Sequence, residues 1–394
     1  MLHFPLFKLA LPQIGDFMND GLHIEKSQAD TSLGTNNSWI ISKMKIATLQ
    51  LDSKIRNVQE NITKADTILR TNPPPCDLDL LVLPELAFTG YNYPSYDSIK
   101  PYLEPTTAGV TTQWAIATAK RLSCHIIAGY PEISTEIDDT APPSTETAIA
   151  HKRYNSTVTV SPAGEILANY RKSFLYYTDE SWATEGPEGF YCDELGSLGK
   201  VGLGICMDIN PYQFSAPWDK YEFAHHVLDG GAKLVVMSMA WLTTLSKEEM
   251  TLLPGSPALE TVSYWLQRFS PMVEATKAGG EDVTVVFSNR IGVEKNEVSE
   301  ITTKTGQVIP LGDEVCYAGS SCAMRFSGGN VSILDMMGKA EEGLLVLDTD
   351  RVCFSFPSVD SSACWTNANL IEQPAKYELR LKAVNSDDET GDDD

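Results

Sequence analysis

From residue 45 onwards, the hydrophobic positions of the chain follow two alternating patterns. Short apolar runs predict strands, and apolar residues recurring every three or four positions predict helices. The predicted strands are Lys45–Leu51, Leu78–Leu83, His125–Tyr130, Tyr154–Val160, Glu165–Tyr170, a run from Val201 that ends at Cys206, Leu234–Met237, Val283–Ser288 and Leu344–Asp348. The predicted helices are a segment capped by Asp52 or Ser53 that ends before Pro73, then Thr111–Leu122, Ala216–Leu228 and Pro257–Lys277.

Strands and helices alternate through most of this region, as they do in parallel βα units. The strands Tyr154–Val160 and Glu165–Tyr170 differ, because the Ser-Pro-Ala-Gly turn signal at 161–164 joins them as a hairpin. Parallel units combined with a hairpin predict mixed β-sheets in a layered α/β fold. Residues 1–44 show no such pattern, and residues 382–394 end in an acidic run. We therefore expect a poorly ordered N-terminal extension, one domain over 45–381 and a disordered tail.

The composition agrees with a large folded domain. The 394 residues are 42% hydrophobic, which is enough to bury one large core or two ordinary ones. No apolar run approaches the roughly 18 residues of a membrane-spanning helix, so we expect no membrane partner. The formal charge of −23 opposes binding to phosphates, which argues against nucleic acid as a partner.

The eight cysteines are scattered along the chain, without a CxxC pair or the cysteine–histidine spacing of zinc ligands. We therefore expect no metal site. Dispersed cysteines in a long chain, without the disulfide framework of a small secreted domain, are typical of free thiols in a reducing compartment. This pattern favours a cytoplasmic protein.

Three residues at the ends of predicted strands carry candidate chemistry. Cys206 follows a glycine-containing strand and precedes a helix, a turn that exposes a nucleophile and aims backbone N–H groups at its target. Glu85 precedes an aromatic segment, where desolvation would raise its pKa and suit it to act as a base. Lys172 near a thiol would lower the thiol pKa and stabilise an oxyanion. Taken singly, each also fits a plainer role: a core cysteine, a solvent-facing glutamate and a surface lysine.

The three segments together resemble one family. PELAFTGY, YRKSFL and GICMD, in this order and each at a strand end, resemble the nitrilase superfamily of carbon–nitrogen hydrolases over residues 45 to 326. The resemblance implies an αββα sandwich with mixed β-sheets, in which Glu85 is the general base, Lys172 the catalytic lysine and Cys206 the nucleophile. Glu180 matches a further catalytic glutamate that some members place beside these three.

A narrower resemblance lies within that superfamily. The segments YRKSFLYYTDESWATEGPEGF, GICMDINPYQFSAPW, SMAWL, SYWLQRFSPM and YAGSSCAMRF resemble the fungal protein N-terminal amidases. This implies hydrolysis of the side-chain amide of N-terminal Asn or Gln in proteins or peptides, with release of ammonia through a cysteine thioester and without a cofactor. The Asp or Glu that remains at the N-terminus is a secondary signal of the N-degron pathway.

This chemistry assigns roles to further residues. The oxyanion would lie between the Lys172 ammonium and the backbone N–H of Met207. A carboxylate is the simplest group to bind the α-ammonium of a substrate N-terminus, and Asp208 is our first candidate, with Glu180 second. The expected substrate-binding residues are Asp208, Trp241, Tyr91 and Asp179, and Glu274 is a further candidate for the ammonium.

Two other functions remain open at this point. The first is a nitrilase-family amidase or carbamoylase that acts on a small-molecule amide. The second is a binding protein that has the nitrilase fold but no catalytic activity, and the presence of Glu85, Lys172 and Cys206 counts against it.

Overall fold

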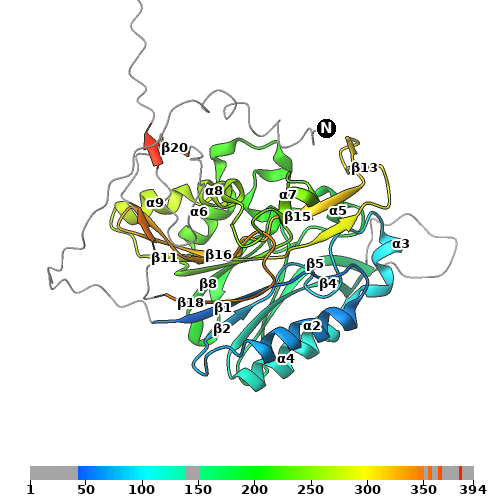
Figure 1. The fold of residues 1–394 in the computed structure, drawn as a ribbon, viewed down its shortest axis with the longest axis horizontal. Helices are drawn as coiled ribbons and strands as arrows, with labels where there is room; N and C mark the ends of the chain where they lie inside the picture. Colours follow the sequence, from blue (N-terminus) through cyan, green and yellow to red (C-terminus); the bar gives the residue numbers. More distant parts are fainter. Residues whose placement is uncertain (1–42, 138–150, 350–353, 357–362, 366–380, 384–394) are drawn as a thin grey trace, which may run out of the picture.

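Two β-sheets lie face to face in the middle of the molecule, and helices cover the outer face of each sheet (Figure 1). The structure is a computed structural model that describes residues 43–137, 151–349, 354–356, 363–365 and 381–383. This four-layered arrangement confirms the predicted αββα sandwich with mixed sheets. The expected N-terminal extension lies outside the described residues except for Lys43 and Met44, and so does the expected acidic tail from residue 384.

The first sheet has the strand order β18-β1-β2-β4-β5-β6, with the short strand β3 paired to β4. Its strands are β1 (Lys45–Gln50), β2 (Leu80–Val82), β3 (Glu104–Pro105), β4 (His125–Ile137), β5 (His151–Val160), β6 (Ile166–Arg171) and β18 (Gly343–Asp348). Strands β1, β2 and β4 are parallel, whereas β5 runs antiparallel to both β4 and β6. The predicted hairpin is therefore confirmed, and β2 and β6 have their carboxyl ends at the same edge of the sheet.

The second sheet has the order β19-β17-β16-β11-β9-β8-β7. Its strands are β7 (Tyr191–Glu194), β8 (Lys200–Ile205), β9 (Leu234–Met239), β11 (Val283–Asn289), β16 (Cys322–Ser327), β17 (Asn330–Met336) and β19 (Phe354–Phe356). The central strands β8, β9 and β11 are parallel. Helices α2 (Val58–Thr71) and α4 (Val110–Leu122) cover the first sheet, and α6 (Glu222–Asp229), α8 (Leu259–Arg268) and α9 (Ser270–Lys277) cover the second (Figure 1).

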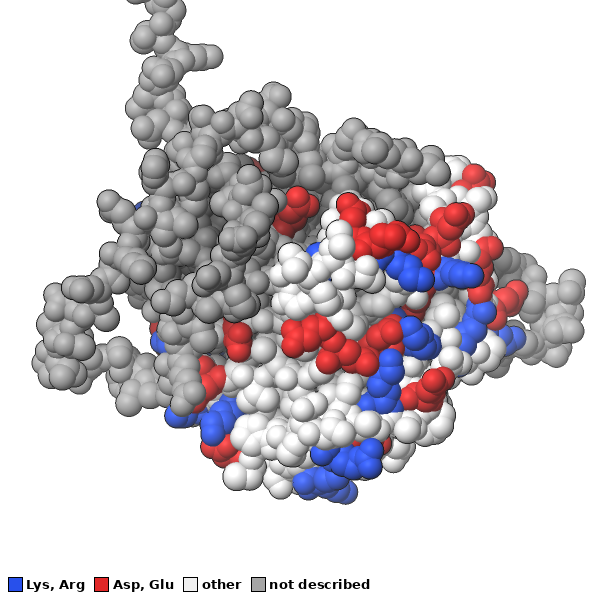
Figure 2. Space-filling view, in the orientation of Figure 1, with Lys and Arg blue, Asp and Glu red and all other residues white. Residues whose placement is uncertain are grey.

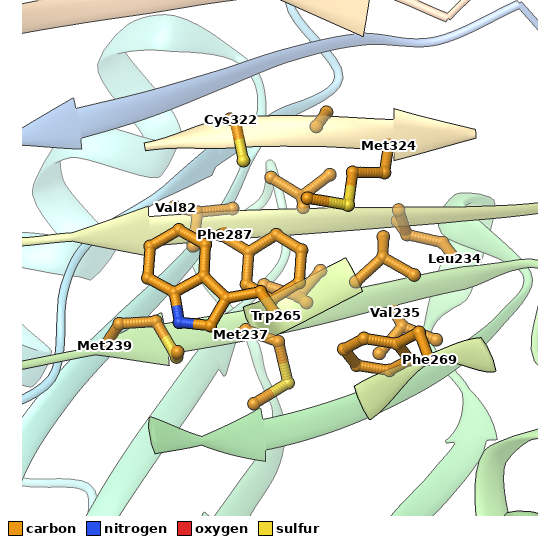
Figure 3. Close-up of a cluster of buried hydrophobic side chains, with 14 of the residues drawn as sticks. Val82, Leu234, Val235, Met237, Met239, Trp265, Phe269, Phe287, Cys322 and Met324 are labelled. Atoms are coloured by element: carbon orange, nitrogen blue, oxygen red, sulfur yellow. The ribbon is translucent and has the colours of Figure 1, made fainter. Parts of the chain in front are cut away.

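The central strands are mostly apolar because both of their faces are buried. In β2, Leu80 and Val82 belong to the core between the sheets, whereas Leu81 packs toward the outer helices. In β11 the two faces divide in the same way: Ser288 points to the first sheet, whereas Phe287 packs against the outer helices, where the indole of Trp265 on α8 stacks on its ring with centroids 4.8 Å apart (Figure 3). The side-chain period of two thus divides one strand between two cores.

Polar contacts also fix the two sheets relative to each other. The Ser238 hydroxyl on β9 donates to the Leu83 carbonyl (2.9 Å), and the Ser288 hydroxyl on β11 donates to the Val82 carbonyl (3.1 Å). Both hydroxyls are buried, so losing either acceptor would leave a costly unpaired group. These bonds hold the end of β2 against the second sheet, at the edge where the candidate residues lie.

Three helix predictions need correction. Helix α2 begins at Val58 rather than just after Ser53, because the Ser53 hydroxyl is used to bond the Ala87 carbonyl. The segment predicted as one helix over Ala216–Leu228 contains the 3-10 turn Trp218–Lys220, and α6 begins only at Glu222. The predicted helix Pro257–Lys277 is two helices separated at Phe269, because Pro271 at the start of α9 cannot donate a helical hydrogen bond.

The described domain closes where its first and last long strands meet. Strand β18 pairs antiparallel with β1. Beyond them the Thr349 N–H donates to the Met44 carbonyl, and the Met44 N–H donates to the Thr349 hydroxyl. The described part of the chain has no helix that is both long and apolar enough to cross a membrane.

Candidate active site

Glu85 lies in a turn just past the carboxyl end of β2. The turn is tight, because Leu86 has a positive φ of 44° and the Ala87 amide bonds the Gly129 carbonyl on β4. A Cβ atom at Gly129 would come within 2.6 Å of the Pro84 carbonyl oxygen and 2.8 Å of the Glu85 Cα. A glycine is therefore required on β4 for the Glu85 turn to pack there.

Lys172 follows β6 directly, and its backbone N–H still pairs with the Asn155 carbonyl on β5. Because β2 and β6 end at the same edge, the two side chains meet there. The Lys172 ammonium donates to Glu85 Oε1 at 2.6 Å and to Asp179 Oδ2 at 2.6 Å. All three side chains are fully buried, with exposed fractions of 0%.

Two further groups hold this ion cluster. The Asn155 side-chain amide donates to Glu85 Oε1 (2.7 Å) and to Asp179 (3.0 Å), so it bridges both carboxylates. The Ala240 backbone N–H, just past β9, donates to Glu85 Oε2 at 2.8 Å. Both oxygens of Glu85 therefore have donors, and the second sheet supplies one of them.

Cys206 approaches from the second sheet. It directly follows β8 and begins the 3-10 turn Cys206–Ile209, with a positive φ of 40°. A non-glycine residue in this region of φ is strained, and such strain is found where a nucleophile must be held clear of its strand. The N–H of Met207 lies in the first turn of this 3-10 segment, where it has no intrahelical acceptor.

The pKa values in the site are set by burial and by the presence of two carboxylates around one ammonium group. Burial raises the pKa of Glu85, the Lys172 charge opposes that rise, and the Asp179 charge adds to it. Burial works to lower the pKa of Lys172, but the two carboxylates outweigh it and the pKa is raised, so Lys172 stays an ammonium. Burial and then the Glu85 charge raise the pKa of Cys206 well above its usual value. The resting site therefore holds a neutral thiol beside a carboxylate that can accept its proton.

Cys206 opens into a cavity of about 750 Å³, a size typical of ligand sites. The aromatic side chains that we predicted as pocket walls, Tyr91 and Trp241, line it, and so does Met207. The lining also includes Tyr176, Phe214 and Tyr264, the helix α7 (Lys247–Thr251) through Lys247, Glu248 and Glu249, and strand β15 (Glu314–Tyr317).

The expectation that Asp208 binds a substrate ammonium is wrong. Asp208 is fully buried, and its carboxylate accepts from the backbone N–H groups of Ser173 (3.1 Å), Phe174 (2.8 Å) and Ile205 (2.7 Å) and from the Tyr170 hydroxyl (2.7 Å). Asp208 instead ties the Cys206 turn to the segment that follows Lys172. Burial raises its pKa to about 6 despite these donors.

Asp179, rather than Glu180, is the acid that contacts Lys172. Asp179 contacts Lys172 and accepts from the Tyr176 backbone N–H, so it is not available for a substrate ammonium. Glu180, which the family resemblance places beside the three catalytic residues, instead accepts from the backbone N–H of Lys304 at 2.8 Å. Both acids lie on the single-turn helix α5 (Tyr177–Glu180), where neighbouring side chains point about 100° apart. Glu274 is exposed and is not among the cavity residues.

Sequence reasoning missed Asn155 and Ala240. Asn155 did give a signal, because asparagine is unusual in a strand, and the other residues of the predicted segment Tyr154–Val160 are tyrosine, serine, threonine and valine. Ala240 contributes only its backbone N–H, which no side-chain pattern can reveal. Within the described residues, no three His, Cys, Asp or Glu side chains are grouped as metal ligands, and the six cysteines described are free thiols.

The fold and site define a class of protein: an αββα sandwich in which a thiol faces a buried carboxylate–lysine pair across two sheets. The model of the carbon–nitrogen hydrolase family matches residues 45–214, a range that contains all three groups. The chain is 30% identical to the protein N-terminal amidase of Schizosaccharomyces pombe over 78% of its own length and 100% of that relative. It belongs to the carbon–nitrogen hydrolase family, in the nitrilase superfamily, and is a hydrolase that acts on amides.

Two further comparisons agree with this assignment. The protein N-terminal amidase of Saccharomyces cerevisiae is 31% identical over 56% of this chain and 50% of its own length. A crystal structure of an N-terminal amidase with an Asn-Glu-Ala peptide superimposes with a TM-score of 0.60 at 22% identity, covering 78% of this chain and 97% of the other. That similarity supports the sandwich fold.

Asp179→Asn tests the role of Asp179 in setting the protonation of Glu85. The Asp179 charge raises the Glu85 pKa, so removing it should move the acid limb of kcat/KM to lower pH, while a less firmly held Lys172 lowers kcat on the order of 100-fold. The measurement is the pH–rate profile of amide hydrolysis. Glu180→Gln is the matched control, because its carboxylate does not contact Lys172, and its acid limb should stay in place. If the acid limb of kcat/KM in Asp179→Asn stays at the same pH or moves to higher pH, this role of Asp179 is contradicted.

Asp208→Asn tests the structural role of Asp208. The amide has one acceptor oxygen for four donors, so we expect the free energy of unfolding to fall on the order of 3 kcal/mol in urea titrations. The preference for a free over an acetylated peptide N-terminus should stay within about twofold of the parent protein. A selective loss of that preference in a stably folded variant would return Asp208 to the substrate site.

Proposed function

We propose that the protein hydrolyses the side-chain amide of N-terminal Asn or Gln in proteins and peptides, giving Asp or Glu and ammonia. The observation that carries the proposal is the cavity itself, because the Cys206 thiol opens into a space whose other lining residues include four carboxylates against a single lysine, Lys247. Such a cavity suits a ligand that carries an amide at one point and a positive charge at another. The two protein N-terminal amidases among the relatives support the same substrate class.

The first half of the reaction is acylation. Glu85 accepts the Cys206 proton as the sulfur attacks the carboxamide carbon, and the negative charge that develops on the oxygen lies between the Lys172 ammonium and the Met207 N–H. Each such donor is worth about 2.7–4 kcal/mol in the transition state. As the carbon–nitrogen bond breaks, Glu85 returns the proton to the nitrogen, ammonia leaves, and a thioester remains on Cys206.

The second half is hydrolysis of the thioester. Glu85 accepts a proton from a water molecule as the oxygen of that water attacks the thioester carbon. The Lys172 ammonium and the Met207 N–H stabilise the second oxyanion as they did the first. The carbon–sulfur bond then breaks, and the departing sulfur takes the proton back from Glu85. The raised pKa of Glu85 suits this role, because one group must alternate between base and acid in each half-reaction. The chemistry uses no metal or organic cofactor.

Glu314 is our candidate for the group that reads the α-ammonium, in place of Asp208. Four acids line the cavity, Glu248, Glu249, Asp313 and Glu314, and Glu314 is the one that is half-buried. Within the described residues its carboxylate has no hydrogen bond or ion pair. Figure 2 shows acidic side chains gathered at the upper right of the visible face, where Figure 1 draws β13 and β15. A field of this sign attracts a cationic peptide N-terminus.

The products of such a reaction are N-terminal Asp and Glu, which serve as secondary N-degrons. We place the enzyme in the cytoplasm, where thiols stay reduced, and the six free cysteines of the described residues support this placement. Neither nucleic acid nor a membrane is among the partners we propose. The alternative substrate, a small-molecule amide, fits the same catalytic groups but leaves the acidic lining of the cavity without a role.

The central test is ammonia release from Asn- and Gln-initiated peptides beside their acetylated counterparts. Acetylation removes the charge that the acidic cavity attracts and adds bulk, so the free peptide should have a kcat/KM at least about 100-fold higher, which corresponds to about 2.7 kcal/mol. Cys206→Ala, folded by circular dichroism, is the control and should release none. Equal rates on the two peptides would refute recognition of the N-terminus and favour a general amidase.

Glu314→Gln tests the proposed reader of the α-ammonium. Loss of a partly desolvated ion pair should raise KM for the Asn-initiated peptide at least about tenfold and leave kcat nearly unchanged. Asp313→Asn, the exposed neighbour on the same cavity wall, is the matched control and should change KM by less than about twofold. Equal effects of the two variants would show a diffuse field rather than a specific contact.

A further inference from the structure

A separate two-stranded hairpin forms one wall of the cavity. Strands β13 (Glu300–Thr302) and β14 (Val308–Pro310) pair only with each other among the described strands. In their register Ile301 lies directly opposite Ile309, so both side chains share one face. Both are buried and both line the cavity, as does Leu311 just after β14. The hairpin thus presents an aliphatic face to the space into which Cys206 opens.

The opposite face of the hairpin points away from the cavity. Thr302 and Val308 form the neighbouring cross-strand pair, and Val308 is 51% exposed. The strict alternation of buried and exposed residues in both strands shows that the hairpin lies flat over the cavity with one side in water. Val308 is therefore a position where the hairpin can be changed without touching the cavity wall.

Glu180 fastens the turn of this hairpin to the body of the protein. Its Oε2 accepts from the Lys304 backbone N–H at 2.8 Å, and the Lys304 ammonium donates to the Ala183 carbonyl at 3.3 Å. A two-stranded hairpin is marginally stable on its own in water, so its position depends on such contacts. Glu180, which the family resemblance placed beside the catalytic residues, is therefore a positioning residue for the cavity wall.

The size of the cavity indicates what this wall contacts. About 750 Å³ is far more space than one asparagine or glutamine side chain fills, and it falls in the range of pockets that hold drug-sized ligands. The chain that follows the N-terminal residue must leave past the outer lining of the cavity. Near Cys206 that lining is aromatic (Tyr91, Trp241), and on the hairpin it is aliphatic.

We propose that the hairpin face formed by Ile301, Ile309 and Leu311 is a subsite for the side chain of the second residue of the substrate. This subsite selects apolar side chains, and the inference rests on the proposed function. Contact with an aliphatic wall removes apolar surface of the ligand from water, which favours leucine over glycine at this position. Aliphatic side chains offer no hydrogen bond to a polar one. The selection lies in binding, so it should act on KM more than on kcat.

The test compares Asn-Leu and Asn-Gly peptides of otherwise identical sequence. We expect kcat/KM for Asn-Leu to be about tenfold higher in the parent protein, mostly through KM. In Ile301→Thr and Ile309→Thr this ratio should fall below about threefold, and threonine keeps the β-branched side chain that suits a strand. Val308→Thr on the outer face is the matched control and should keep the tenfold ratio. A ratio near one in the parent protein, or equal ratios in all variants, overturns the proposal.

A second pair of variants tests the anchoring by Glu180. Glu180→Ala removes the acceptor for the Lys304 N–H and should lower the Leu/Gly ratio of kcat/KM, whereas Glu180→Gln keeps an acceptor oxygen and should restore it. A merely structural role would lower activity on both peptides in parallel and leave the ratio unchanged. The two Glu180 variants also test the subsite if the Ile301 and Ile309 variants do not fold.

Binding to the Cys206→Ala protein separates this inference from the proposed function. Isothermal titration calorimetry with the two uncleaved peptides reports the subsite directly. If the parent protein releases no ammonia from either peptide but the Cys206→Ala protein binds Asn-Leu more tightly than Asn-Gly, the subsite stands and the proposed reaction falls. If ammonia is released equally from both and both bind equally, the reaction stands and the subsite falls. If neither peptide reacts or binds, both fall.

Discussion

The buried ammonium of Lys172 is the interaction on which the arrangement of the site depends. An unpaired ammonium in a protein interior is so costly that it would lose its proton, and even a paired one is stable only when its partners are fully hydrogen-bonded. The partners come from separate parts of the chain: Glu85 after β2, Asp179 on α5, and Asn155 on β5 to bridge them. The first sheet must therefore bring the carboxyl ends of β2 and β6 and the middle of β5 together before this cluster can form.

The second sheet supplies the remaining groups of the site. Its contributions are the Ala240 N–H on Glu85, the strained turn at Cys206, and the hydroxyls of Ser238 and Ser288 that bond the end of β2. The apolar core between the sheets excludes water, which strengthens each of these electrostatic contacts and raises the pKa of the thiol. Asp208 links the two halves, since one carboxylate binds both the strand before Cys206 and the segment after Lys172.

The hydrophobic pattern was sufficient to predict mixed sheets in a layered α/β fold, and the resemblance of three motifs to one family supplied the αββα sandwich and the roles of Glu85, Lys172 and Cys206. The sequence was insufficient where a contact depends on rotation about a helix. Asp179 and Glu180 are adjacent in α5, and the sequence indicates an acid near Lys172 without saying which of the two points toward it. Asp208 looked available for a substrate because its four donors are three backbone N–H groups and a distant tyrosine. The break between α8 and α9, in contrast, could have been predicted from the sequence, because Pro271 has no N–H to donate, but our single predicted helix over Pro257–Lys277 did not include this break.

The acidic residues of this chain divide according to whether the fold already satisfies them. Glu85, Asp179 and Asp208 are buried and each accepts several hydrogen bonds, so their charges are used within the protein. Among the residues that line the cavity, the carboxylates of Glu248, Asp313 and Glu314 have no such partners within the described part of the chain. The lining also holds one cation, Lys247, but the acids outnumber it, so the net charge around the reactive thiol is negative and favours a cationic ligand. The excess of acid that argued against nucleic acid thus becomes an argument for a cationic substrate, and a free peptide N-terminus is one.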